Sequence, residues 1–147
     1  VLANILSTEP AGEIKITASG GNFITGTAGG TPFAFSTAPG ETYKVAGIST
    51  DALALTWSGD TVFAADATRL LWDGNLSLMS AEPLVCEISP KGMTYDLMAK
   101  SVVKIGLKNQ PREISINGVK TALTYDPKTE TANITLPAGE GRIDFLK

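Results

Sequence analysis

Ser101 and Lys104 have the spacing of a Ser-x-x-Lys motif, in which a lysine helps a serine to act as an acyl-transfer nucleophile. That chemistry needs both side chains on one face, as at the start of a helix. The motif here lies in the alternating run Val103, Ile105, Leu107. Strand side chains alternate between faces, so an offset of three places Ser101 and Lys104 on opposite faces. We therefore expect no serine–lysine catalysis.

Asp60, Asp66 and Asp73 stand beside turns and could supply a carboxylate pair or a calcium site. Two carboxylates that flank a glycosidic bond carry out hydrolysis in most glycosidases. Carboxylates beside turns more often form Asx-turns and solubilise the surface. No loop shows the regular ligand spacing of a calcium site. We expect neither a catalytic pair nor a metal site.

Aromatic residues gather in the first half of the chain, where Trp57, Trp72 and Tyr43 are accompanied by Phe33 and Phe35. An exposed aromatic ring on a sheet suits a sugar, because the apolar face of the sugar can stack on it. The same residues sit on alternating strand positions and would serve equally well in the core. Trp57, Trp72 and Tyr43 are our candidates for carbohydrate binding, and the core interpretation stays open for each.

The chain contains no histidine and one cysteine, Cys86. Triads that use histidine are therefore excluded, as are the usual zinc sites. Cys86 shares an alternate face with Leu84 and Ile88, which predicts a small core residue and not a reactive thiol. We assign no catalytic residue and expect neither a cofactor nor catalytic activity from this chain alone.

Period-two alternation of apolar residues recurs along the chain and indicates strands. Turn sequences separate the runs, among them Ser58-Gly59-Asp60, Asp73-Gly74-Asn75, Ser89-Pro90-Lys91-Gly92, Asn117-Gly118 and the longer loop 125–130. Residues 65–72 could share a helical face, but the Asp-Gly turn that follows favours a strand entering a hairpin. The pattern predicts an all-β fold, an antiparallel β-sandwich of many short strands.

The composition fits one domain, residues 1–147, with 43% apolar residues and a net charge of −3. Lysine and arginine are scattered, so no nucleic-acid partner is expected. No apolar run reaches the ~18 residues of a membrane span. A charge-poor, weakly acidic chain suggests a secreted or periplasmic protein. Because the sequence begins at Val1 without a signal peptide, we expect it to be the C-terminal part of a longer protein.

Residues 63–74, FAADATRLLWDG, are followed by residues 78–88, LMSAEPLVCEI. This stretch resembles the late β-sandwich region of heparinase II/III-like polysaccharide lyases, where an Ala-Thr strand leads through a short hairpin to a Ser-x-x-Pro strand. The runs 103–107, 112–118, 134–139 and 143–145 resemble the closing strands of such enzymes. Residues 1–6 would then be a strand entered from an upstream domain.

The resemblance covers about half of the chain and implies a fold and an accessory role. In these lyases, catalysis uses tyrosine, histidine and arginine or asparagine from other parts of the protein, so no active-site residue transfers to this chain. The leading hypothesis is a non-catalytic accessory domain of a secreted bacterial polysaccharide-degrading enzyme. It would pack on an upstream catalytic domain and contact the polysaccharide. A carbohydrate-binding module and a structural or adhesion β-sandwich are the alternatives.

Overall fold

The computed structural model describes residues 12–146, and every regular element in that range is a β-strand. All pairings between strands are antiparallel, which confirms the all-β, antiparallel prediction. The first eight strands are β1 (Ile14–Gly20), β2 (Phe23–Ala28), β3 (Thr31–Ser36), β4 (Tyr43–Val45), β5 (Ile48–Thr50), β6 (Ala54–Ser58), β7 (Thr61–Trp72) and β8 (Leu76–Ser89). The remaining seven are β9 (Gly92–Leu97), β10 (Ser101–Leu107), β11 (Glu113–Ile116), β12 (Val119–Ala122), β13 (Tyr125–Asp126), β14 (Thr131–Leu136) and β15 (Gly139–Leu146).

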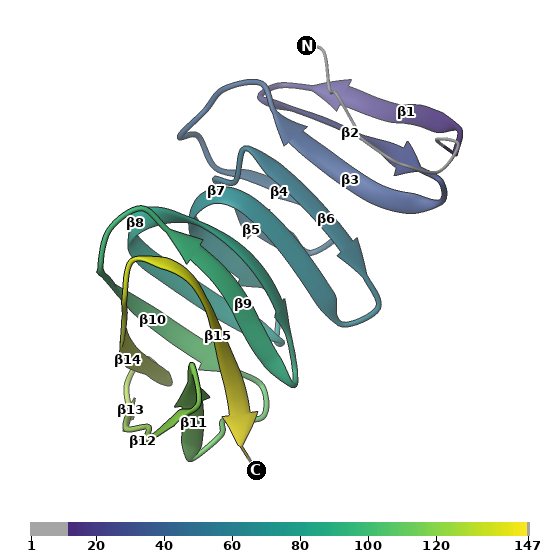
Figure 1. Cartoon of the computed structure of the whole chain (residues 1–147). Coiled ribbons are helices and arrows are strands. Elements are labelled where there is room, and N and C mark those ends of the chain that lie inside the picture. The colour runs from purple at the N-terminus through teal and green to yellow at the C-terminus, as the bar shows by residue number, and fades with distance from the viewer. Residues whose placement is uncertain (1–11, 147) are drawn as a thin grey trace.

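The strands form one continuous 15-stranded sheet instead of two separate sheets. Its longest path runs β1-β2-β3-β6-β7-β8-β9-β15-β11-β12. The long strands β7 and β8 each pair with different strands along their first and last parts. The first part of β7 pairs with β6 and its last part with β5, while β8 pairs first with β10 and later with β9. The sheet therefore folds over along the middle of β7 and β8, as their curvature in Figure 1 shows.

β7 bends where its pairing with β8 is irregular. The register shifts between Ala64 and Ala67, and Asp66 has a φ of 56°. A bulge of this kind bends a strand and leaves backbone groups outside the ladder. The Asp51 carboxylate accepts hydrogen bonds from the Thr68 and Arg69 backbone N–H groups, at 3.0 and 2.9 Å, and from the Thr68 hydroxyl. Asp51 thereby pairs the N–H groups at the bend, which would otherwise cost free energy.

The folded sheet encloses one apolar core. One row of residues crosses β5, β7, β8 and β10, and it consists of Ile48, Trp72, Leu76 and Leu107. A second row crosses β7, β8, β9 and β15, and it consists of Val62, Ile88, Met93 and Ile143. Both rows belong to, or pack against, the same hydrophobic cluster. Because the two rows lie on the two halves of the sheet, β7 and β8 contribute to the core from both sides.

The turn predictions agree with the structure. Ser58-Gly59-Asp60, Asp73-Gly74-Asn75, Ser89-Pro90-Lys91-Gly92 and Asn117-Gly118 each connect paired strands, and residues 127–130 connect β13 to β14. Residues 65–72 form the second part of β7, as expected. Leu84, Cys86 and Ile88, which were predicted to share a face, belong to the long strand β8, which begins at Leu76. The prediction of a strand at residues 1–6 lies outside the described residues.

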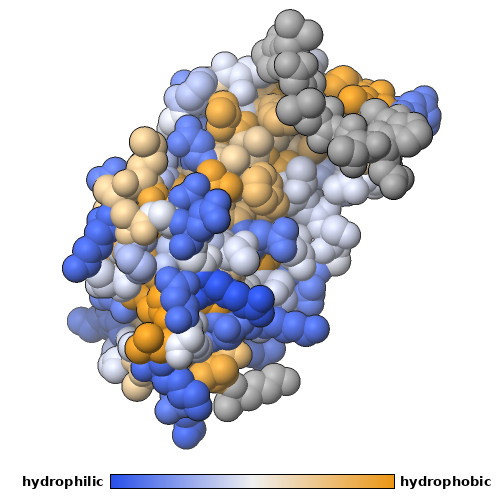
Figure 2. All heavy atoms as spheres, viewed as in Figure 1, coloured by the Kyte–Doolittle hydropathy of each residue, from blue (hydrophilic) through white to orange (hydrophobic). Residues whose placement is uncertain are grey.

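β1 to β3 extend the sheet away from the rest of the molecule (Figure 1). Every residue of β1 is exposed, and Ile14 and Ile16 expose 49% and 60% of their surface. Phe33 and Phe35 lie on the same face of β3, with ring centroids 5.2 Å apart. Figure 2 shows apolar residues in the region of β3 and β6, whereas hydrophilic residues dominate the C-terminal half of this view.

Candidate functional site

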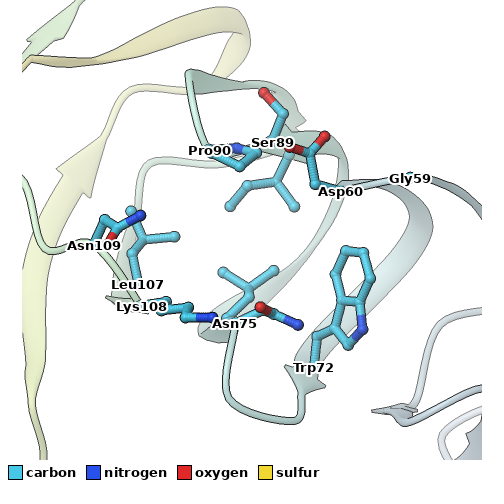
Figure 3. A pocket seen from close by; sticks show the side chains of 11 residues that line it. Gly59, Asp60, Trp72, Asn75, Ser89, Pro90, Leu107, Lys108 and Asn109 are labelled. Atoms are coloured by element: carbon cyan, nitrogen blue, oxygen red, sulfur yellow. The ribbon is translucent and has the colours of Figure 1, made fainter.

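A cavity of about 270 Å³ lies at the end of the folded sheet, where four segments of the chain converge (Figure 3). Its lining residues are Gly59, Asp60, Trp72, Asn75, Leu76, Ile88, Ser89, Pro90, Leu107, Lys108 and Asn109. They come from the β6–β7 turn, the β7–β8 turn, the β8–β9 turn and the segment that follows β10. The site is therefore built from turns that the core strands hold in place, which is a common location for binding residues.

The cavity exists because β7 and β8 bend. Asp60 precedes the first residue of β7 and Trp72 is its last, yet both line the cavity. In the same way Leu76 begins β8 and Ile88 lies near its end. Straight strands of this length would separate those ends by several tens of ångströms, at about 3.3 Å per residue. The bend that Asp51 stabilises therefore brings the two ends of each strand to one site.

The base of the cavity is apolar. Trp72, Leu76 and Leu107 lie in one row across β7, β8 and β10, and Ile88 contributes from the other half of the sheet. In Figure 3 the Trp72 indole borders one side of the cavity and Leu107 borders the opposite side. Trp72 is partly buried against the core cluster. Its ring is thus held by packing while part of its surface remains open to the cavity.

The rim of the cavity is polar and can donate and accept hydrogen bonds. Asp60 brings a carboxylate, Lys108 an ammonium group, Asn75 and Asn109 carboxamides, and Ser89 a hydroxyl. The rim is fixed at two points, because the Lys108 N–H donates to the Asn75 carbonyl at 3.0 Å and the Ser89 hydroxyl accepts from the Lys91 N–H at 3.3 Å. An apolar base with a few placed polar groups is the usual composition of a small-ligand site.

The three aromatic residues predicted to bind carbohydrate lie in different environments. Trp72 lines the cavity, whereas Trp57 on β6 packs against the core and does not line it. Tyr43 on β4 is 3% exposed and stacks on Phe23 with ring centroids 5.2 Å apart. Burial, and secondarily the charge of Asp51, raises the pKa of Tyr43 to about 12. Tyr43 is therefore a core residue, and its ring is inaccessible to a ligand in this structure.

The other polar candidates do not converge. Ser101 is buried and Lys104 is exposed on β10, as their offset of three predicts. Among the three aspartates only Asp60 lines the cavity, because Asp66 lies in the bend of β7 and Asp73 forms an ion pair with Lys44 at 3.0 Å. Within residues 12–146 no group of three or more His, Cys, Asp or Glu side chains could hold a metal ion.

Cys86 is a core residue, as its alternation with Leu84 and Ile88 predicts. It is 2% exposed on β8. Burial raises the pKa of its thiol to about 12, although the hydrogen bond with the Ala64 backbone lowers it. A thiol with this pKa is protonated at neutral pH and unreactive.

Sequence reasoning did not find Asn75, Ser89, Lys108 and Asn109 as site residues. Two of them, Asn75 and Ser89, lie in turns that were recognised as turns, but nothing local distinguishes a turn that borders a cavity from one that does not. Lys108 and Asn109 follow β10 and meet the β7–β8 turn only through the β8–β10 pairing. Such a juxtaposition is a property of the sheet topology and has no local signal.

No protein-family model and no curated protein matches the chain. In the described range, 12–146, no helix is long and apolar enough to cross a membrane.

Proposed function

We propose that this chain is a non-catalytic glycan-binding domain whose ligand packs on Trp72 in the cavity at the end of the sheet. The observation that supports this function best is the combination of an indole held at the cavity wall with hydrogen-bonding groups around the rim. A sugar ring has an apolar face that stacks on an aromatic ring and an edge of hydroxyls that need partners. Asp60, Asn75 and Lys108 supply acceptors and donors for such hydroxyls.

The cavity lining favours binding over glycoside hydrolysis. The described residues that line it contribute one carboxylate, Asp60, and one ammonium group, Lys108. Hydrolysis by most glycosidases requires two carboxyl groups about 5–10 Å apart. Asp66 and Asp73, the other two candidates, do not line the cavity. These groups suit recognition of a bound sugar.

We further propose that the domain is an accessory part of a secreted polysaccharide-degrading enzyme of the heparinase II/III-like type. Support comes from the similarity of residues 63–88 and of the closing strands to the sandwich region of such lyases. The apolar side chains that β1 exposes offer surface for packing against a catalytic domain. Sequencing the source gene upstream of the Val1 codon tests this. A long open reading frame with tyrosine, histidine and arginine candidates is expected, and a short linker alone would contradict it.

The binding function is tested by tryptophan fluorescence, because the chain has two tryptophans. The Trp57→Phe variant retains Trp72 alone, and Trp72→Phe retains Trp57 alone. We expect a glycan identified on an array to shift the emission of Trp57→Phe and to leave the emission of Trp72→Phe unchanged. Trp72→Ala should reduce affinity at least tenfold while the circular dichroism stays that of the parent. A glycan that binds Trp72→Ala with parental affinity would exclude this site.

A further inference from the structure

A second hollow of about 220 Å³ lies beside the Trp72 cavity. The two hollows share Trp72, Asn75, Leu76, Leu107 and Lys108 as lining residues. The shared residues form one wall, and the hollows lie next to each other along it. A ligand in the first hollow that extended past Asn75 and Lys108 would enter the second.

The shared wall is a fixed feature of the sheet. Leu76 and Leu107 are directly paired across β8 and β10, and the Lys108 N–H donates to the Asn75 carbonyl at 3.0 Å. Asn75 and Lys108 themselves are exposed. Their side chains can therefore contact a ligand that passes over the top of the wall, with no rearrangement of the strands beneath it.

The residues that line only the second hollow include several polar side chains. They include Gln110, which follows β10, Thr129 in the turn before β14, and Thr131, the first residue of β14. The Thr129 and Thr131 hydroxyls lie 2.9 Å apart, and the Gln110 amide donates to the Glu130 carbonyl at 3.1 Å. A carboxamide has two N–H donors and a carbonyl acceptor, so Gln110 keeps hydrogen-bonding capacity for a ligand.

The turn before β14 lies against β10 because residue 106 is a glycine. A Cβ atom on Gly106 would lie 3.0 Å from the Glu130 carbonyl oxygen and 3.3 Å from Thr131 Cγ2. A side chain at this position would require the turn or the strand to shift by a few tenths of an ångström. Gly106 therefore permits the close approach that places Thr129 and Thr131 at the edge of the second hollow.

We propose that the second hollow is a further sugar subsite, so that the ligand is an oligosaccharide of at least two rings that crosses the wall at Asn75 and Lys108. This inference rests on the proposed glycan-binding function. One ring stacks on Trp72 in the first hollow, and the next ring is held by hydrogen bonds to Gln110 and Thr129 in the second. The domain then binds an oligosaccharide more tightly than a free monosaccharide, because only an oligosaccharide fills both hollows.

The test is isothermal titration calorimetry with glucose, mannose and galactose, each compared with its 1,4-linked di-, tri- and tetrasaccharide. For the sugar that binds, we expect affinity to rise about tenfold or more from monosaccharide to disaccharide, which is the effect of one or two added hydrogen bonds. The double variant Gln110→Ala/Thr129→Val should lose that rise and keep the parental affinity for the monosaccharide. Lys104→Ala, an exposed residue of β10 that lines neither hollow, is the matched control.

The outcomes separate this inference from the function on which it rests. Equal affinity for monosaccharide and disaccharide, or an equal loss for both in the double variant, would overturn the second subsite and leave Trp72 binding intact. Absence of binding for every sugar, together with unchanged Trp72 fluorescence, would overturn both. A rise with chain length that Gln110→Ala/Thr129→Val removes and Lys104→Ala retains supports the second subsite.

Discussion

Asp60 and Trp72 line the same cavity although the whole length of β7 separates them in the chain. They meet because β7 changes direction at Asp66, so that its first part pairs with β6 and its last part with β5. The carboxylate and the indole thus line one cavity from opposite ends of one strand. The geometry of the site consequently depends on the bend as much as on the lining residues.

Replacing Asp60 by alanine should weaken glycan binding by roughly tenfold or more, because a hydrogen bond to a charged group contributes about 1.5–3 kcal/mol. Titration calorimetry measures the change. Asp73→Asn is the control, since Asp73 is exposed and does not line the cavity. Equal affinities for Asp60→Ala and the parent would show that the carboxylate does not contact the ligand.

Replacing Asp51 by alanine should destabilise the bend of β7 by about 2 kcal/mol, because the Thr68 and Arg69 N–H groups lose a charged acceptor. Urea unfolding followed by circular dichroism gives the free energy of unfolding. Asp73→Asn, which removes an exposed ion pair, should change that free energy by less than about 1 kcal/mol. Asp51→Ala should also weaken glycan binding, because Asp60 and Trp72 would no longer be held together. Parental stability would mean that the bend does not need this carboxylate.

Ionisation of Cys86 should destabilise the fold in alkaline solution. Burial raises the pKa of the thiol from 9.0 to about 12, so the folded state holds this proton where the unfolded state releases it. The stabilisation is fully present below about pH 9 and is lost as the pH rises toward 12, at up to about 1.4 kcal/mol per pH unit. Urea unfolding at pH 8, 9, 10 and 11 measures this slope. In Cys86→Ala the slope between pH 9 and 10 should be shallower, and an unchanged slope would assign it to other groups.

Tyr43 is a second group whose ionisation should destabilise the fold in alkaline solution, and the Tyr43→Phe variant removes its contribution. Burial raises the pKa of Tyr43 from 10.0 to about 12, with a smaller contribution from Asp51, so its stabilisation is lost only above about pH 10. The Tyr43 hydroxyl is buried without a hydrogen-bond partner among the described residues. Removing it should therefore cost little at pH 7 and should reduce the loss of stability between pH 10 and 12. A large loss at pH 7 would reveal a partner for this hydroxyl.

Gly141→Ala should destabilise the protein by about 1–3 kcal/mol, the usual cost of forcing atoms into a packed interior. A Cβ atom at this position would lie 2.3 Å from the Tyr95 ring, and Tyr95 is 3% exposed. Gly20→Ala is the matched control, because no atom of residues 12–146 lies within 4 Å of its Cβ position. Thermal unfolding compares the two variants. Equal melting temperatures would show that Tyr95 can move aside at no cost.

The strand content of this protein was predictable because it depends on local patterns. Alternation placed Leu84, Cys86 and Ile88 on one face, and the Asp-Gly and Asn-Gly turns marked where hairpins reverse. The strands β2, β4, β5 and β12 showed no alternating apolar run and were not predicted. In β2 the apolar residues Phe23 and Ile24 are adjacent and Thr25-Gly26-Thr27 follows, so no alternation appears. β4 and β5 have three residues each, which is too short for an alternating pattern to be recognised.

The sequence alone determined the all-β class, most hairpin turns, the core position of Cys86 and the absence of histidine chemistry. Whether an aromatic residue faces a ligand or the core was decided only by the tertiary structure. Trp57, Trp72 and Tyr43 all occupy strand positions, yet only Trp72 stands where a strand ends beside a cavity. The reason is physical: alternation records which residues share a face, whereas a cavity arises where the bend of β7 and β8 brings distant turns together.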